Sequence, residues 1–506
     1  MSLKKLEVGP DHHLSIDNVF DVAKDPSIRV FVSKKAQIEV KKARDFIEGA
    51  LKDRKVIYGV TTGFGSFKDR VISQDDVVEL QENLIRSHCV GVGPLLNQEQ
   101  VRASLLVRLN SLAKGFSGVR QELLDLVCIL LNKNIIPVVP SQGSVGASGD
   151  LAPLSHMGLI LMGEGEVFFK GKRQPTKKVF KQQKIQPIHF QAKEGLAFNN
   201  GTSVMAGCAA LSLYRGMHLA DIADLSSAMT LEAICGTSNA FDSRIHMIRP
   251  HSGQILSAKM VKKYVSDSSL VDSVENRVQD SYSIRCVPQV HGAVRDALTY
   301  VRLIIEREIN SVTDNPLIFS KDKTVLSGGN FHGEPIAIAM DTFAIAISEL
   351  ANISERRIAK LLDPSTNQGL PAFLINATKA GLHSGLMILQ YTAAALVSEN
   401  KIFSHPASVD SIPTSANQED HVSMGSIAVQ KSFRVIENAE KVISIEMLCS
   451  VQGIDFRGSE RLGKYTKKAY KLIRSSVKHV SGDRVFSIDI EKTYNLFDPL
   501  YKILRS

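Results

Sequence analysis

Cysteine is scarce in this sequence, and the few cysteines lie far apart. The chain of 506 residues contains six, and no two of them form a Cys-x-x-Cys pair. In a chain of this length, such spacing argues against a disulfide framework, so we expect reduced and mostly buried thiols. The six positions are Cys89, Cys128, Cys208, Cys235, Cys286 and Cys449.

Long apolar runs are also lacking. No stretch approaches the roughly 20 uncharged apolar residues that a membrane-spanning helix requires. The N-terminal segment, MSLKKLEVGPDHHLS, has no apolar stretch of the kind found in signal peptides. We therefore expect a cytoplasmic protein with no membrane partner.

No linker divides the chain. It has no long Pro/Gly/Ser tract, no low-complexity run, no block of like charge and no internal repeat. We therefore predict a single domain over residues 1–506. The functional loops are expected in the N-terminal half, and a long central helix bundle is expected at about 200–450.

Positive charge is present but not concentrated. The formal net charge is +9, yet the Lys and Arg residues are scattered, as in Lys41-Lys42 and Lys467-Lys468. No aromatic residues interleave with them and no nucleic-acid-binding motif is recognisable. We expect a mildly basic surface that attracts small anionic substrates, and no nucleic-acid partner.

Helical periodicity dominates the sequence. Between Gly333 and Asp363, apolar residues recur at steps of three, four or multiples of these, which is the pattern of one helix face. Several similar stretches exceed the average helix length, which indicates a bundle of long helices and a mainly α fold. These stretches are 74–92, 97–113, 118–134, 203–234, 290–311, 380–402 and 425–450.

Strands are expected to be few and short. Val167–Phe169, followed by Lys170-Gly171-Lys172, has the pattern of a small hairpin. Two further short strands are predicted near Lys55–Val60 and Thr324–Leu326.

The most informative stretch is the glycine-rich segment Gly143-Ser-Val-Gly-Ala-Ser-Gly-Asp150. It matches neither the GxxxxGK[ST] phosphate loop nor the GxGxxG dinucleotide motif. It is not the GxSxG elbow of serine hydrolases, because Asp150 stands two residues after Ser148. The chain has no HExxH, which excludes a zincin-type metal site. Taken alone, the segment is equally well explained as a turn into a helix with Asp150 as N-cap.

Together with the residues that follow it, this segment resembles the signature of the aromatic amino acid ammonia-lyases. The matching run is Gly143-Ser-Val-Gly-Ala-Ser-Gly-Asp-Leu-Ala-Pro-Leu154. The resemblance implies that Ala147-Ser148-Gly149 cyclises autocatalytically to 4-methylidene-imidazol-5-one, an electrophilic prosthetic group, with no metal and no diffusible cofactor. Cyclisation brings the Gly149 nitrogen to the Ala147 carbonyl, which requires an attacking residue without Cβ. A helix beginning near Asp150 would point its positive end at the group and favour electron withdrawal.

The resemblance covers roughly residues 10 to 450 and implies an ammonia-lyase/fumarase-like fold. Tyr58-Gly-Val-Thr-Thr-Gly-Phe-Gly65 resembles the segment of the catalytic tyrosine, so Tyr58 is expected to take the β-proton of the substrate. Asn200-Gly-Thr202 resembles the segment whose asparagine lies beside the prosthetic group. In Gly328-Gly-Asn-Phe-His-Gly333, the resemblance implies that Phe331 lies near the electrophile.

A further block, Gln279-Asp-Ser-Tyr-Ser-Ile-Arg285, resembles the family's Gln/Tyr/Arg segment. The resemblance implies that Gln279 and Tyr282 act with Asn200 to orient the substrate amine and the carbonyl of the prosthetic group. It also implies that Arg285 holds the substrate carboxylate. In this family, each active site combines residues from three subunits of a homotetramer, and the same assembly is expected here.

Two positions bear on the choice of substrate. His88 follows Ser87 where phenylalanine lyases have an apolar pair, and Glu419 stands where phenylalanine and tyrosine lyases usually have Gln. The two side chains would make a polar pocket able to bond both nitrogens of an imidazole. We therefore predict elimination of ammonia from L-histidine to give urocanate, the first step of histidine degradation. The sequence leaves open whether Glu419 bonds the imidazole or the amine.

Several alternatives stay open on the sequence alone. Within the family they are a phenylalanine or tyrosine lyase, or an aminomutase that returns ammonia to the β-carbon. Ser155 and Ser281 depart from the family pattern and put the subtype, but not the reaction class, in doubt. Outside the family, the chain would be a non-catalytic helical oligomer or a nucleic-acid-binding scaffold, and His88 an ordinary helix-face histidine.

Overall fold

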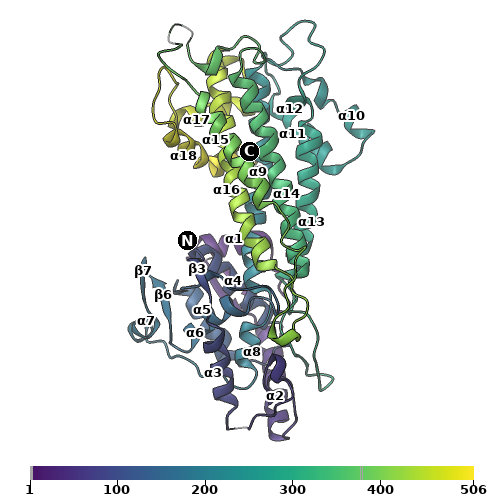
Figure 1. Ribbon diagram of the computed structural model, residues 1–506, viewed down its shortest axis with the longest axis vertical. Coiled ribbons are helices and arrows are strands. Elements are labelled where there is room, and N and C mark those ends of the chain that lie inside the picture. The colour runs from purple at the N-terminus through teal and green to yellow at the C-terminus, as the bar shows by residue number, and fades with distance from the viewer. Residues whose placement is uncertain (1–3, 74, 377, 379, 506) are drawn as a thin grey trace. The chain divides into compact units, whose positions relative to one another are not determined.

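The computed structural model describes residues 4–73, 75–376, 378 and 380–505. Helices hold 58% of the residues and the strands are short, which confirms the prediction of a mainly α fold (Figure 1). The longest helices are α9 (Ser203–Ala233), α13 (Val287–Glu308), α14 (Glu334–Leu362) and α16 (Gly425–Asp455). Each coincides with a predicted helical stretch to within a few residues.

The chain forms two compact units, each assembled from segments that are separate in the sequence. The first unit comprises Met1–Tyr214, Arg302–Asp341 and Pro406–Gln430. The second comprises Arg215–Val301, Thr342–His405 and Lys431–Ser506. The single domain over 1–506 stays a prediction.

The first unit combines its helices with small sheets. Strands β1 and β2 pair in parallel, β3 pairs with β5, β6 lies between β4 and β7, and β8 pairs with β9. Its strands are β1 (Lys5–Val8), β2 (Arg29–Val32), β3 (Val92–Leu95), β4 (Ile136–Pro137), β5 (Pro140–Gln142), β6 (Glu166–Phe169), β7 (Lys172–Pro175), β8 (Leu317–Phe319) and β9 (Thr324–Leu326). Its helices are α1 (Ile16–Lys24), α2 (Lys34–Lys52), α3 (Val77–His88), α4 (Gln98–Leu112), α5 (Gln121–Asn132), α6 (Leu151–Leu161), α7 (Thr176–Gln183) and α8 (Glu194–Asn199), with the short 3-10 turns η1 (Gly65–Phe67) and η5 (Ser415–Asn417).

Local capping sets some of these helix starts. Before α4, the Asn97 side chain accepts the N–H of Gln100 at 2.9 Å, and the Gln100 side chain accepts the N–H of Asn97 at 2.8 Å. This reciprocal pair satisfies two backbone donors that the helix leaves free. Serine at position 15 and asparagine at position 18 do the same before α1.

Two of the three predicted strand regions are confirmed, namely the hairpin β6–β7 and the strand β9. The strand predicted near Lys55–Val60 is wrong, because the backbone there turns. The Thr61 hydroxyl accepts the Ile57 N–H at 2.9 Å and donates to the Lys55 carbonyl at 3.0 Å. Such local bonds compete with a strand ladder. The helix predicted over 74–92 begins at Val77 and ends at His88, and its first predicted residue, Gln74, lies outside the described residues.

The second unit is a helical bundle with a polar centre. Glu446 of α16 accepts bonds from Thr230 of α9 at 2.7 Å and from Arg357 of α14 at 2.6 and 2.8 Å. His291 of α13 bonds Asp224 of α9 at 2.7 Å. All of these side chains are buried, so the four long helices meet here around paired charges. The unit also contains α10 (Ser243–Met247), α11 (Ser252–Tyr264), α12 (Tyr282–Arg285), α15 (Met387–Phe403), α17 (Lys464–Ser476), α18 (Ser487–Tyr494) and α19 (Phe497–Arg505).

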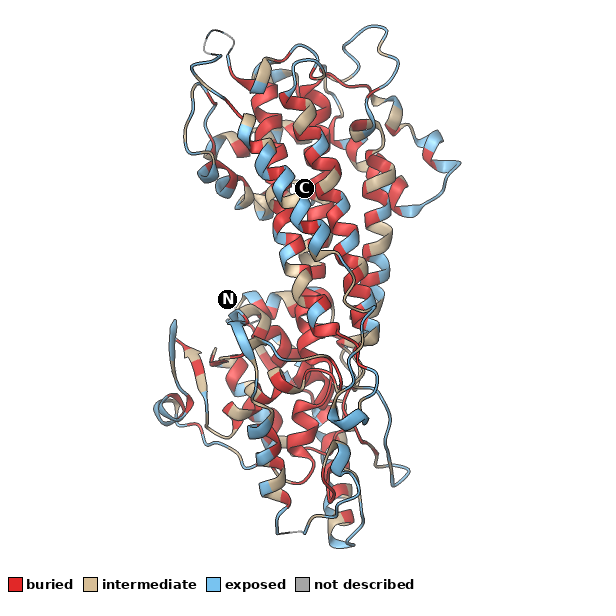
Figure 2. Ribbon diagram, viewed as in Figure 1, coloured by how far each residue is buried: buried red, intermediate tan, exposed pale blue. Residues whose placement is uncertain are grey.

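Among the described residues, one helix is long and apolar enough to cross a membrane, namely α14. However, 72% of its most apolar window is buried within the protein, as in the core helix of a globular fold. Figure 2 shows the buried positions running along the long helices.

Candidate active site

A large pocket opens among the loops of the first unit. Its volume is about 1170 Å³, which is ample for an amino acid substrate. Gly149 lines a second, smaller cavity that shares His88 and Glu419 with the large one. The predicted site residues that line the large pocket are Tyr58, His88, Ala147, Ser148, Asn200, Phe331 and Glu419.

The Ala-Ser-Gly segment lies in the loop between β5 and α6, where glycine is required by space as well as by conformation. Gly149 has φ +77°, and a Cβ there would lie 2.1 Å from the Gly201 carbonyl oxygen. Gly146 has φ +73°, and its Cβ would lie 2.2 Å from the Ser423 hydroxyl. Both are left-handed positions that glycine adopts at little cost. The backbone of this loop therefore packs closely against the segments that contain Gly201 and Ser423.

Ser148 is held at both its carbonyl and its hydroxyl. The carbonyl oxygen accepts the Gly201 N–H at 3.1 Å and the Asn200 side-chain amide at 3.2 Å. The hydroxyl donates to Glu419 at 3.1 Å. Asn200 Oδ1 is buried and has no hydrogen-bond partner among the described residues. The site thus keeps one buried acceptor unused beside the Ser148 carbonyl.

Asp150 occupies the N-cap position that the sequence suggested for α6, but its side chain does not cap that helix. Helix α6 does begin at the next residue, but the Asp150 side chain makes no capping bond to it. Instead the carboxylate accepts the N–H groups of Val204 and Met205, at 2.8 and 2.9 Å, in the first turn of α9. Burial raises the pKa of Asp150 to about 7. The residue therefore ties the Ala-Ser-Gly loop to the start of α9.

The segment carrying Tyr58 lies against the segment carrying Glu419. The Tyr58 hydroxyl oxygen accepts the Gly65 N–H at 3.2 Å, which fixes its orientation. Close to that glycine, Lys68 donates to the side chain of Gln418 at 2.9 Å. Tyr58, the expected base, and Glu419, expected to form part of the polar pocket, are thus on neighbouring loops.

Glu419 follows a strained turn. Ser415, Ala416 and Asn417 all have left-handed φ values, of 50°, 52° and 62°. Non-glycine residues in this region cost of order 1–3 kcal/mol each and persist only where the surroundings impose them. The turn lets Thr414 pair with Glu419 and donate its hydroxyl to the carboxylate at 2.6 Å. Sequence reasoning missed Thr414, since only Asn417 of the turn is a residue type that favours this conformation.

His88 stands at the C-terminal end of α3 and is half-buried. Burial lowers its pKa, and the opposing charge of Glu419 acts in the other direction. The Ser87 hydroxyl donates to the Leu84 carbonyl at 3.2 Å and lies 3.1 Å from His88 Nδ1. Because that hydroxyl has one proton, we assign the imidazole proton to Nδ1, which leaves Nε2 as an acceptor.

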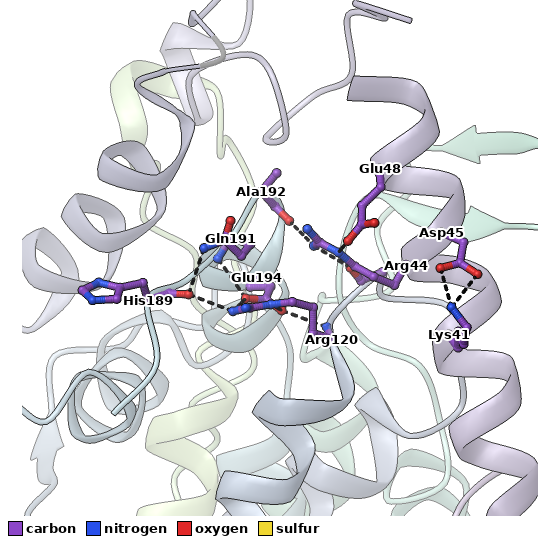
Figure 3. A network of polar contacts seen from close by, with 10 residues as sticks. Lys41, Arg44, Asp45, Glu48, Arg120, His189, Gln191, Ala192 and Glu194 are labelled. Carbon is purple, nitrogen blue, oxygen red and sulfur yellow. Dashed lines mark hydrogen bonds and ion pairs between the residues drawn. The ribbon is translucent and has the colours of Figure 1, made fainter. Parts of the chain in front are cut away.

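The chain segment that precedes Asn200 is held in place by buried ion pairs. Glu194 begins α8, which ends one residue before Asn200. Its carboxylate accepts the Arg120 backbone N–H at 2.8 Å, the Arg120 guanidinium at 2.7 and 2.9 Å, and the Gln191 N–H at 2.8 Å (Figure 3). Next to it, Lys193 forms a fully buried ion pair with Asp314 at 2.7 Å. These contacts hold the segment rigidly against the site.

Three predicted site residues are not brought into this pocket. Gln279, Tyr282 and Arg285 belong to the second unit and are not among the residues that line the pocket. Tyr282 is 70% exposed, and the Arg285 guanidinium lies over its ring at 4.5 Å. The pocket of the first unit therefore contains only part of the predicted residue set.

The pocket also contains two histidines that sequence reasoning did not single out. His332 and His421 both line it. Their positions in the sequence could have indicated a place in the pocket, because His332 directly follows Phe331 and His421 comes two residues after Glu419.

Comparison with known proteins shows which family this chain resembles. The family described as aromatic amino acid lyase matches residues 14–475. A histidine ammonia-lyase from Caldanaerobacter subterraneus subsp. tengcongensis is 50% identical over 96% of this chain and 95% of its own length. The crystal structure of histidine ammonia-lyase from Trypanosoma cruzi is 40% identical, with a TM-score of 0.92 over 99% of this chain and 95% of that chain.

A second solved structure, tyrosine aminomutase from Streptomyces globisporus, is 37% identical, with a TM-score of 0.94 over 99% of this chain and 98% of that chain. These structures confirm the expected ammonia-lyase-like fold. The chain belongs to the aromatic amino acid lyase family.

Proposed function

We propose that the protein eliminates ammonia from L-histidine to give urocanate. The observation that carries this proposal is that His88 and Glu419 line the same pocket as Ala147 and Ser148. A site that hydrogen-bonds an imidazole strongly rejects a phenyl ring, because the ring would leave buried polar atoms unpaired. The relatives named histidine ammonia-lyase support the same substrate.

The proposal includes the prosthetic group 4-methylidene-imidazol-5-one, formed from Ala147-Ser148-Gly149. Two features fit it: the lack of room for a Cβ at Gly149, and the unused buried oxygen of Asn200 beside the Ser148 carbonyl. Asn200 and the Gly201 N–H would hold the carbonyl of residue 148. When formed, the group supplies an electrophilic carbon toward which the substrate amine is directed.

The other side chains of the pocket bind the substrate and move its proton. Tyr58, oriented by the Gly65 N–H, takes the β-proton. His88 accepts an imidazole N–H at Nε2, the nitrogen left free by its contact with Ser87. Glu419 accepts an N–H from either the imidazole or the amine, and Phe331 packs near the reacting atoms.

The residue that the resemblance assigns to the substrate carboxylate, Arg285, does not line this pocket. We infer a homotetramer in which neighbouring copies bring Arg285, Gln279 and Tyr282 to the pocket. Arg285 would bind the carboxylate bidentately. The exposure of Tyr282 supports a position at a contact between copies.

The test is formation of the α,β-unsaturated acid by the purified protein, followed by ultraviolet absorbance. Urocanate from L-histidine is compared with the corresponding products of L-phenylalanine and L-tyrosine over a range of substrate concentrations. We expect kcat/KM to be highest for L-histidine by several orders of magnitude. A preference for another amino acid would overturn the substrate assignment but not the reaction class. Because the likeness to tyrosine aminomutase favours mutase activity as the second candidate, the products are also analysed for β-amino acids.

A further inference from the structure

A histidine–carboxylate cluster stands in the wall of the pocket, outside the proposed catalytic set. Across the part of the chain that the structure describes, one group of His, Cys, Asp or Glu side chains has the spacing of metal ligands. It consists of His332, Glu334 and His421, whose ligand atoms all lie within 4.8 Å of one another. His332 and His421 line the pocket, and Glu334 begins α14.

The separation of the two imidazoles fits a shared ion. His332 Nε2 and His421 Nδ1 lie 3.4 Å apart, and the rings are stacked with centroids at 5.4 Å. Two nitrogens bound to a tetrahedral Zn²⁺ at about 2.0–2.1 Å lie about 3.3–3.4 Å apart. A nitrogen–nitrogen distance of 3.4 Å is, by contrast, long for a hydrogen bond.

The carboxylate provides the second, independent observation. Glu334 Oε2 is buried and has no hydrogen-bond partner among the described residues. An unpaired buried carboxylate oxygen is costly, and a cation beside it removes the cost. The residue with the unpaired carboxylate oxygen thus belongs to the same cluster as the two imidazoles.

We propose that His332, Glu334 and His421 bind one divalent transition-metal ion of the Zn²⁺ or Co²⁺ type. Two imidazoles and one carboxylate select such ions over Mg²⁺ and Ca²⁺, which prefer all-oxygen sites. Three protein ligands leave a coordination position open, and the two histidines line the pocket. The ion is an addition to the proposed elimination chemistry, which does not require it.

Two existing contacts of His332 must change when the ion binds. His332 Nδ1 accepts the Glu334 backbone N–H at 3.3 Å, so the proton of the neutral ring resides on Nε2 and points toward His421. Binding through Nε2 requires the neutral ring to change tautomer, so that its proton moves from Nε2 to Nδ1 and the ring stays neutral. This change gives up the contact with His421 Nδ1 and the hydrogen bond from the Glu334 N–H, and metal–nitrogen bonds replace them.

The experiment uses full-length protein without a polyhistidine tag, stripped with a chelator. Co²⁺ is titrated and its visible absorption recorded, and Zn²⁺ binding is measured by equilibrium dialysis. We expect one saturable ion per chain, with Zn²⁺ displacing Co²⁺. Glu334→Gln and His421→Ala should each weaken binding by roughly tenfold or more. His251→Ala, which removes an exposed histidine of the second unit, should bind as the wild type does.

Melting temperature and intact mass show which variants are folded. The metal affinity of one folded site variant, either Glu334→Gln or His421→Ala, is sufficient to test the proposal. Absence of saturable binding in the wild type would overturn the proposal. So would equal affinity in the folded site variants, which would leave the cluster as a plain histidine–histidine contact. Neither measurement uses turnover, so the outcome is independent of the proposed lyase activity.

Discussion

Among single residues, Ser148 makes the contacts on which the proposed prosthetic group depends. We expect the intact protein to weigh less than its sequence by two water molecules, because cyclisation and dehydration each release one. Ser148→Ala should lose the dehydration and most turnover, whereas Ser475→Ala, at an exposed position of α17, should keep both. Mass spectrometry of the intact chain checks this. An active wild-type protein of unmodified mass contradicts the proposal.

Tyr58 is tested by removing only its hydroxyl. Tyr58→Phe should lower kcat by about 10²–10⁴-fold, the usual contribution of a positioned base, while the mass loss of two waters persists. Tyr391→Phe, which removes an exposed hydroxyl on α15, serves as the control and should turn over normally. Near-normal turnover of Tyr58→Phe would move the role of base to another group, with Glu419 the next choice.

His88 is expected to set the preference for histidine over phenylalanine. A pocket that hydrogen-bonds its substrate discriminates by about 10⁴–10⁵-fold against an analogue without the partner groups. His88→Phe should therefore lower kcat/KM strongly for L-histidine and little for L-phenylalanine, and His251→Phe should leave both unchanged. The ratio of the two kcat/KM values is the quantity to measure. An equal fall in kcat/KM for both substrates would indicate that His88 has a structural role.

At this scale, the sequence located the side chains of the pocket better than the bonds that hold them. Family motifs pointed to Tyr58, Ser148 and Glu419, and the structure places all three in one pocket. The motif gave no hint that Asp150 would cap α9 rather than α6, because the partner segment lies more than 50 residues away. Thr414 was missed for a similar reason, since its role arises from a left-handed turn that propensities disfavour.

At the scale of elements, the helices were predictable because their apolar faces recur with helical period. Errors occurred where local bonds or glycines override that pattern. The strand predicted at Lys55–Val60 is a turn closed by Thr61. The helix predicted from residue 380 begins only at Met387, after Gly381 and Gly385 adopt left-handed φ values of 90° and 60°.

The segment leading to Asn200 offers a test at the scale of elements. Glu194→Ala leaves the partly buried Arg120 without its carboxylate, and breaking such a pair costs about 3–5 kcal/mol. The melting temperature should fall clearly. Asp45→Ala is the matched control, because the Lys41–Asp45 pair in the same view is 74% and 56% exposed and worth about 1 kcal/mol or less (Figure 3). Equal melting temperatures for the two variants would argue against a supporting role for Glu194.

At the scale of the whole molecule, no sequence pattern indicates two compact units, because each unit is discontinuous in the chain. The four long helices, α9, α13, α14 and α16, each contain a boundary between the units within the helix, so no linker marks it. The expected site residues divide along the same line. Tyr58, Ser148 and Glu419 belong to the first unit, and Gln279, Tyr282 and Arg285 to the second.

This division makes subunit sharing testable by complementation. Tyr58→Phe and Arg285→Ala are each expected to form nearly inactive homo-oligomers. If every site takes Tyr58 and Arg285 from different chains, co-assembly of the two variants at equal amounts should restore about one quarter of wild-type activity, since each of the two residues is intact half of the time. If one chain supplied both residues, no mixture would regain activity, because every chain would carry one defect. Mixing folded homo-oligomers without unfolding is the control and should stay inactive. Activity per site, counted by the modified mass of residues 147–149, separates true complementation from a difference in prosthetic-group formation.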